Sequence, residues 1–373
     1  MRKILFVISA IALLSACTKS EVAYTEDVEI GLKPLTKNIT KAMVDDTAFP
    51  NESFAVWAYY KQLGKGTSIT TWQSSTLDQQ TYINEKPFSQ RGTTGLWGGE
   101  GAAYYWPKVG SLMFVGYYPV SIDAPTESNP DGKVKYEFSS SVNKMTVTGY
   151  SPTTDNYDAT GFVNTAEGAN HVEDFMYFNM TSASCDATTT GPANSVTSGN
   201  HIDVVFKHAL SWLTVVLKKD SSTPAGATIT VKSVHFSEVN TAGTGTVNNS
   251  PAQGESNVIS WDTTTSDEID VYVLGSSTTA NTVALTNDYT CKQPVIIPQE
   301  MDGNIVITYE IKSTDGSAFT ETKTLPLSGL TSSVTSWDPA KKYTYTITIG
   351  TSEILIDPAI TDWTDVEATI DVK

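Results

Sequence analysis

Positive charge, cysteine and long apolar runs are all scarce in this sequence, and each scarcity excludes a class of protein. The 373 residues hold 24 Lys and Arg against 41 Asp and Glu, which gives a net charge of −17. Because neutralising phosphates needs clustered Lys and Arg, we expect no nucleic-acid partner. No apolar run reaches the about 20 residues that a membrane-spanning helix needs. Only 17% of the residues are charged, but a hydrophobic fraction of 39% still supports a folded core.

Familiar catalytic and metal-binding patterns are also missing. The chain has no GxSxG elbow, HExxH motif, Walker loop or dinucleotide fingerprint. Its histidines have no metal-ligand spacing, and its cysteines form no zinc pattern. His208 lies on an apolar face, where we expect a core histidine. Asp-Gly pairs such as Asp315-Gly316 fit hairpin turns better than calcium loops. We therefore predict that the chain is not an enzyme and binds no cofactor or metal.

The first residues predict export as a lipoprotein. Arg2 and Lys3 precede a short apolar run, and Cys17 follows small residues in the stretch LSAC at 14–17. This pattern is typical of a bacterial lipobox, so we predict a lipoprotein signal peptide over residues 1–16 and lipidation of the Cys17 thiol. Acyl chains on Cys17 would anchor the precursor to a membrane. The alternative is an ordinary signal peptide that happens to contain a cysteine.

The chain from residue 17 onward keeps two further cysteines, Cys185 and Cys291. They are distant in sequence, and they could pair in an oxidising compartment. Two unpaired thiols are the preferred interpretation.

Period-two alternation dominates the chain and predicts an all-β fold. Apolar and polar residues alternate along three segments: 201–210, 304–311 and 342–349. Residues 53–60 and 112–118 are apolar on both faces, as expected of central strands. The apolar phase slips between Val231 and Val234, which predicts a β-bulge.

A small, polar stretch with Gly and Pro at residues 186–200 is the best linker candidate. It divides the mature chain into two parts of β-sandwich size. We expect an N-terminal domain over residues 17–198 and a C-terminal domain over residues 199–373.

A short strand is expected near the front of the mature chain, at about residues 26–34. Val28, Ile30 and Leu32 lie on one face of it, and Pro34 stops it. Residues 37–41, with a lysine at each end, follow in a polar connection. The plain interpretation is the first strand of a sandwich.

The last eight residues also alternate, and their apolar row is Val366, Ala368, Ile370 and Val372. Since unpaired backbone groups and an apolar row are both unfavourable in water, a terminal strand must find a sheet edge. That edge belongs either to its own domain or to another molecule.

Several aromatic stretches follow one another in order over most of the mature chain. They are FAVWAYY at 54–60, WP at 106–107, LMFVGYYP at 112–119, DFMY at 174–177, VVFKHALS at 204–211, IPQ at 297–299, WDPAKKY at 337–343 and ITDW at 360–363. This ordered set resembles the fimbrillin family, the Mfa-like and FimA-like subunits of type V pili made by Bacteroidales bacteria.

The resemblance implies two transthyretin-like β-sandwich domains in tandem and a lipoprotein precursor carried to the outer membrane. It implies that a protease removes the first strand, with Val28, Ile30 and Leu32, and that a terminal donor strand of a neighbouring subunit fills the groove. The product is a cell-surface fimbrium. Its partners are other copies of the chain or related pilus subunits, and a surface receptor that the sequence does not identify.

The scissile residue departs from the family pattern. Family members often present an Arg between the first two strands, whereas the mature chain has only Arg91, elsewhere. Lys41 lies where the scissile basic residue would be, and Lys37 is the second candidate.

Two other functions remain open. A tip or surface adhesin would keep its first strand and never polymerise. A glycan-binding outer-membrane lipoprotein would use aromatic residues beside glycines, such as Trp97, as a stacking platform. For Trp97 itself, a place in a buried strand is the commoner explanation.

Overall fold

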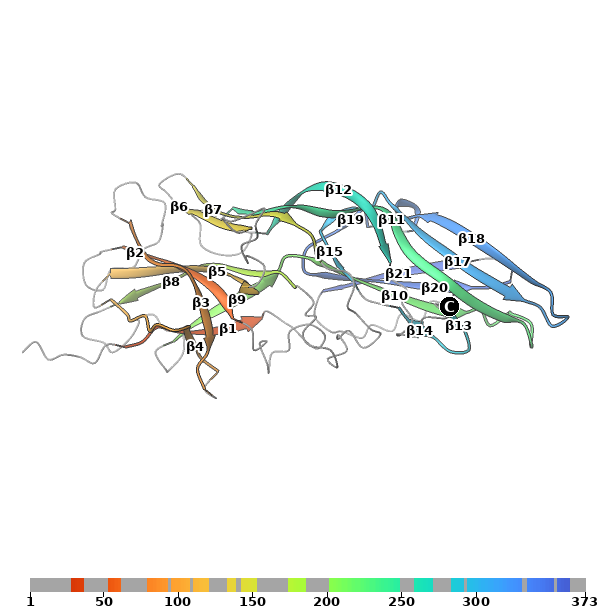
Figure 1. Ribbon diagram of the computed structural model, residues 1–373, viewed down its shortest axis with the longest axis horizontal. Coiled ribbons are helices and arrows are strands. Elements are labelled where there is room, and N and C mark those ends of the chain that lie inside the picture. Colours follow the sequence, from red (N-terminus) through yellow and green to blue (C-terminus); the bar gives the residue numbers. More distant parts are fainter. Residues whose placement is uncertain are drawn as a thin grey trace, which may run out of the picture.

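In the computed structural model, the strands are arranged one group after another along a long axis (Figure 1). The described residues are 28–36, 53–61, 79–92, 95–107, 110–120, 133–138, 142–152, 174–185, 201–248, 258–270, 283–291, 294–330, 334–351 and 354–362. Among them there is no α-helix, and η3 (Leu327–Gly329) is a 3₁₀ turn. The predicted all-β class is confirmed.

One set of strands closes into a barrel in the order β1-β4-β3-β2-β5-β8-β9. The bounds are β1 Gly31–Thr36, β2 Phe54–Lys61, β3 Gln79–Gln90, β4 Trp97–Gly99, β5 Gly110–Tyr118, β8 Met176–Cys185 and β9 His201–His208. Neighbouring strands are antiparallel except for β1 and β9, which run parallel. The β1–β9 pairing closes the ring, so strands far apart in sequence complete the barrel.

A long sheet has the order β18-β17-β11-β7-β6, and β12 and β13 also pair with β11. The bounds are β6 Val134–Phe138, β7 Asn143–Tyr150, β11 Thr228–Asn248, β12 Ser260–Asp270, β13 Val283–Ala284, β17 Asn304–Lys312 and β18 Ala318–Pro326. One end of β11 pairs with β17 and the other with β7, so this 21-residue strand joins β7, which lies over the barrel, to β17 farther along the molecule (Figure 1).

A second, shorter sheet faces the long one. Its order is β14-β10-β20-β21, and β15 also pairs with β10. The bounds are β10 Ser211–Lys219, β14 Tyr289–Thr290, β15 Val295–Ile296, β20 Lys341–Ile349 and β21 Ile354–Asp362, and a separate pair is formed by β16 Gln299–Glu300 and β19 Ser336–Trp337. We call β1–β5, β8 and β9 the barrel half, and β10–β11 with β13–β21 the two-sheet half.

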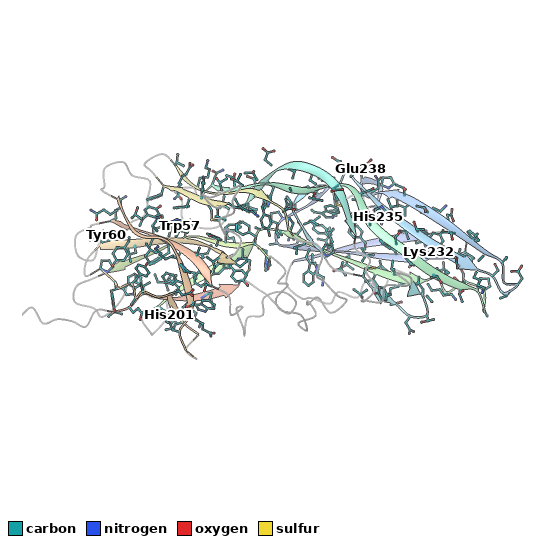
Figure 2. The ribbon with its side chains drawn as sticks, viewed as in Figure 1. Trp57, Tyr60, His201, Lys232, His235 and Glu238 are labelled. Carbon is teal, nitrogen blue, oxygen red and sulfur yellow. The ribbon has the colours of Figure 1, made fainter. Side chains whose placement is uncertain are left out.

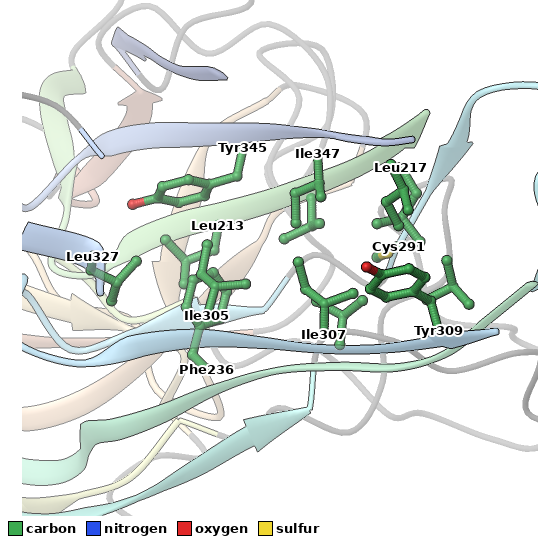
Figure 3. Packing of buried hydrophobic residues seen from close by; sticks show 14 of the residues in the cluster. Leu213, Leu217, Phe236, Cys291, Ile305, Ile307, Tyr309, Leu327, Tyr345 and Ile347 are labelled. Carbon is green, nitrogen blue, oxygen red and sulfur yellow. The ribbon is translucent and has the colours of Figure 1, made fainter. Parts of the chain in front are cut away.

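The core of the two-sheet half lies between its facing sheets. Leu213 and Ile347 come from one sheet, and Ile305 and Ile307 come from the other. Figure 3 shows these side chains pointing toward one another between the strands. The alternation along 304–311 and 342–349 therefore predicted the buried faces of β17 and β20.

Strands β2 and β5 are buried on both faces, as their sequences predict. Phe54 and Val56 point into the barrel, whereas Trp57 belongs to a second cluster outside it. The Trp57 ring lies 5.7 Å from the Tyr136 ring of β6. The long sheet thus covers the outer face of the barrel.

The predicted bulge is also confirmed, because the β11–β17 register shifts between Val231 and Ser233. The expected domain division after residue 198 falls outside the described residues. β9, which follows it, belongs to the barrel, and β10 begins the two-sheet half. Sheet membership therefore places the boundary between the two halves between β9 and β10. A division of the chain into tandem domains stays a prediction.

Candidate functional site

The segment that begins at Val28 lies in a slot of the barrel. On one side, the Ile30 N–H donates to the Tyr104 carbonyl at 2.7 Å, and the Trp106 N–H donates to the Val28 carbonyl at 2.9 Å. Glu29 is therefore directly opposite Tyr105, as an antiparallel bridge. Further along, Leu32 pairs with Trp97 of β4.

The segment continues along the chain as β1. The other edge of β1 pairs with β9, and the two strands run parallel. The register pairs Gly31–Thr36 with His201–Phe206, so the expectation that Pro34 stops the strand is wrong. Beyond Leu32 the register pairs β1 with β9 alone, and a proline is tolerated at such an edge. Figure 2 labels His201 in the barrel half, far from the labelled residues of β11. Since β1 pairs with β4 on one side and with β9 on the other, its loss would break the ring of paired strands and leave a slot between β4 and β9.

The side chains of the first strand alternate as the sequence predicts. Ile30 and Leu32 are 1% and 0% exposed, and Val28 is half-buried against the same cluster. Glu29 and Lys33, on the other face, are exposed. Burying an Ile or Leu side chain stabilises a fold by about 1.5–3 kcal/mol. The first strand is thus an integral part of the barrel core.

An ion pair lies on the rim of the slot. Arg91 Nη2 is 3.0 Å from Glu29 Oε1, and the same nitrogen donates to the Gly99 carbonyl at 2.6 Å. Gly98 makes room for the pair, because a Cβ at Gly98 would lie 2.7 Å from Arg91 Nε. The sequence alone did not predict this role of Arg91, since the contact joins residues 62 positions apart.

The two flanks of the slot also meet beneath it. The Phe54 ring of β2 lies 5.3 Å from the Trp97 ring of β4 and 5.3 Å from the Phe206 ring of β9. Aromatic pairs at such distances add stability beyond their buried area. Phe54 therefore ties β4 to β9 without help from the first strand.

Other expected site residues lie outside the described residues. They are Cys17, Lys37, Lys41 and the row Val366, Ala368, Ile370 and Val372. In sequence, Lys37 and Lys41 lie between β1 and β2.

The remaining polar candidates have structural surroundings. Cys291 is a buried free thiol, and its burial raises the pKa of the thiol, so it stays protonated at neutral pH. His208 is a core histidine as predicted, and its Nδ1 lies 2.8 Å from Asp174 Oδ2. Trp97 is 2% exposed, so it is a barrel core residue and not an open stacking platform.

A polar cleft lies beside β11, β12 and the β16–β19 pair. Its lining includes Glu238, Trp261, Gln299, Asp302 and Trp337. The Trp337 indole N–H donates to the Tyr345 hydroxyl at 2.8 Å, and that of Trp261 donates to the Ala209 carbonyl at 2.9 Å. The polar atoms of both tryptophans are thus used within the fold.

Within the described part of the chain, no helix has the length and apolarity to cross a membrane, and no cluster of three or more His, Cys, Asp or Glu side chains is arranged to hold a metal.

Comparisons with known proteins cover most of the chain. A family model described as fimbrillin-like matches residues 124–363, and a model of the prokaryotic membrane lipoprotein lipid attachment site matches residues 1–18. No match was found among the curated proteins.

Two solved structures illustrate the likeness in fold. A fimbrial protein from Bacteroides vulgatus is 16% identical and aligns with a TM-score of 0.55 over 91% of this chain and 100% of that chain. The tip fimbrial protein Mfa3 from Porphyromonas gingivalis, with a C-terminal truncation, is 13% identical, with a TM-score of 0.37 over 91% of this chain and 100% of that chain. The first of these supports the fold alone.

Proposed function

The chain belongs to the fimbrillin-like family, a family of fimbrial adhesion proteins and not of enzymes, and from this premise we propose that it is a structural subunit of a type V pilus that polymerises by strand exchange. The observation that carries the proposal is the slot between β4 and β9, which one short strand fills. In the proposal, proteolysis removes that strand, and the last strand of another copy replaces it. The two tandem transthyretin-like sandwiches belong to this proposal.

The proposed path begins with a lipoprotein precursor. The lipid attachment match over residues 1–18 supports lipidation of Cys17 and hence a membrane anchor. We place that anchor in the outer membrane. Because the intact precursor fills its own slot, it cannot accept another strand during export.

Cleavage in the connection between β1 and β2 would then release the first strand. Lys41 is the proposed scissile residue and Lys37 the second choice, since both lie between the two strands. Once this connection is cut, only non-covalent contacts hold the first strand in the barrel. The Phe54 contacts with Trp97 and Phe206 support a slot that keeps its flanks together afterwards.

The incoming strand would be the row Val366, Ala368, Ile370 and Val372. Backbone hydrogen bonds give adhesion to the slot, and the alternate apolar side chains set the register. Ordering a free tail costs conformational entropy, so the equilibrium gain is modest. Durability would come from slow unfolding of a barrel closed around the strand.

A surface or tip adhesin that keeps its first strand is the second candidate. The depth at which Ile30 and Leu32 are buried favours it, because a strand so well packed is costly to remove. The candidate that uses Trp97 as a glycan platform has lost its support, since that ring is buried.

Deletion of residues 366–373 tests the proposal. We expect producing cells to make a folded, exported monomer and no fimbriae, as seen by electron microscopy with an antibody to this chain. Thr369→Ser, on the other face of the same strand, is the matched control and should leave fimbriae intact. Normal fimbriae from the deletion would refute strand exchange.

A further inference from the structure

The slot selects its occupant through a buried row and a charged rim. The buried row of the first strand is Val28, Ile30 and Leu32, and the rim contact is the pair Glu29–Arg91. An incoming strand fits best when it matches both features, because side chains on successive residues point to opposite faces. The buried row contributes most, since an exposed ion pair is weak. The slot therefore specifies a pattern of apolar and acidic residues.

Arg91 is positioned independently of Glu29. Its Nη2 donates to the Gly99 carbonyl at 2.6 Å, and its Nε lies over Gly98, where a Cβ would approach to 2.7 Å. Both contacts are with β4, which stays when the first strand leaves. Arg91 would then remain on the rim without its Glu29 carboxylate.

The end of the chain repeats the beginning of the first strand. Asp27-Val28-Glu29 recurs as Asp365-Val366-Glu367, and an apolar residue follows at the same alternate positions in both segments. Aligned on these residues, Ala368 corresponds to Ile30, and Ile370 corresponds to Leu32.

On this basis, and resting on the proposed strand exchange, we propose that the last strand of a second copy enters the slot in the direction of β1. Val366, Ala368 and Ile370 take the places of Val28, Ile30 and Leu32. Glu367 takes the place of Glu29 and pairs with Arg91 of the accepting copy.

Other registers fit the slot less well. A shift by one residue would turn the charged face of the strand into the barrel core. A shift that moves Thr369 opposite Arg91 removes the carboxylate from the rim. A shift that moves Asp365 opposite Arg91 keeps a carboxylate, but it leaves Ala368 in the place of the fully buried Leu32.

The register makes the Ile30 position the weak point of the complex, because Ala368 fills only part of the space that Ile30 fills. Ala368→Ile should therefore make subunits leave denaturant-treated fimbriae more slowly, by about tenfold or more. Thr369→Ile, whose side chain lies on the outer face in this register, is the matched control and should not slow their release. Equal effects of the two variants would overturn the register.

A cysteine scan tests the register directly. Glu29 and Tyr105 form a bridge flanked by the hydrogen bonds of Ile30 and Trp106, so their Cα atoms are about 4.5 Å apart, within the range of a disulfide. Full-length chains that carry Tyr105→Cys with Asp365→Cys, Glu367→Cys or Thr369→Cys are expressed in producing cells. Their fimbriae are oxidised and separated without reductant, with Tyr105→Cys alone as the background.

We expect covalent multimers at least tenfold more abundant for Glu367→Cys than for the other two positions. A maximum at Asp365→Cys or Thr369→Cys would overturn the register and leave strand exchange standing. Fimbriae that cross-link at none of the three positions and whose subunits still contain residues 28–36 would overturn strand exchange as well.

A charge exchange tests the rim contact. Because exposed ion pairs are weak, Arg91→Glu or Glu367→Arg alone should slow assembly by only about two- to fivefold. The double variant should recover most of the loss. Single variants that assemble at the normal rate, or a double variant no better than either, would overturn the Arg91–Glu367 pair.

Discussion

The two halves of the molecule close their sheets in different ways. In the two-sheet half, the edge strands β18 and β21 each follow their pairing partner directly in sequence, β17 and β20. In the barrel half, the closing pair is β1 with β9, which are the first and the last barrel strands along the chain. β18 and β21 therefore pair with the strand that precedes them in sequence, whereas neither partner of β1 adjoins it, so one cut before β2 leaves β1 held by non-covalent contacts to distant segments.

This difference shows where an exchangeable strand can exist. A strand can be traded only if its neighbours stay together without it, and the contacts of Phe54 with Trp97 and Phe206 meet that condition. In the two-sheet half, loss of β20 would remove Tyr345 and Ile347 from the centre of the core. The barrel half is therefore the proposed site of strand exchange, and the two-sheet half keeps all of its strands in this proposal.

Locking the first strand in its slot should have the largest effect on fimbrial assembly. Glu29→Cys with Tyr105→Cys places two thiols at a bridge pair, so a disulfide would hold the strand in its slot. We expect oxidised cells to export the chain but to assemble no fimbriae, and a mild reductant to restore assembly. Electron microscopy and gels with and without reductant measure this.

The matched control for the lock is a hairpin edge. Thr308→Cys with Thr322→Cys joins β17 to β18, which never separate in the proposal, and it should not affect assembly. If fimbriae still form while the first strand is locked, the barrel half does not assemble by exchanging that strand.

Truncating one core side chain in each half should change the free energy of unfolding differently before and after maturation. Leu32 and Ile347 are both 0% exposed, and either change to Ala should destabilise the precursor by about 2–5 kcal/mol. After maturation, Leu32→Ala should have no effect, because its strand has left, and Ile347→Ala should keep its full effect. Urea unfolding of precursor and of assembled subunits measures both.

The result for assembled subunits decides this test. Equal losses for Leu32→Ala and Ile347→Ala would mean that the first strand remains in the mature barrel.

The smallest effect is expected at the scissile residue. Lys41→Ala should slow maturation several-fold without stopping it, because Lys37 offers a second basic site between the same strands. The ratio of precursor to mature chain on a gel, followed over time, measures the rate. N-terminal sequencing should find Ala42 first in the parent, and a different start would move the site.

Much of the fold could be predicted from local patterns. Alternation located β9, β17 and β20, and the slip between Val231 and Val234 located the bulge of β11. The Asp315-Gly316 turn joins β17 to β18, with Gly316 at a φ of +87°. Such features depend on neighbouring residues, which a sequence displays directly.

The arrangement in space could not be predicted in the same way. The parallel β1–β9 pair and the Arg91–Glu29 contact join residues far apart in sequence. Alternation states which face of a strand is buried, but it does not state which strand lies beside it. For the same reason, the alternation along β9 did not show that this strand closes the barrel beside β1.

Electron cryo-microscopy of fimbriae purified from producing cells tests the central claim most directly. In the slot between β4 and β9, we predict side-chain density that fits residues 366–370 of a second copy, with an acidic side chain facing Arg91. Density that fits Val28 to Leu32 of the same copy, continuous with its own chain, would contradict the account.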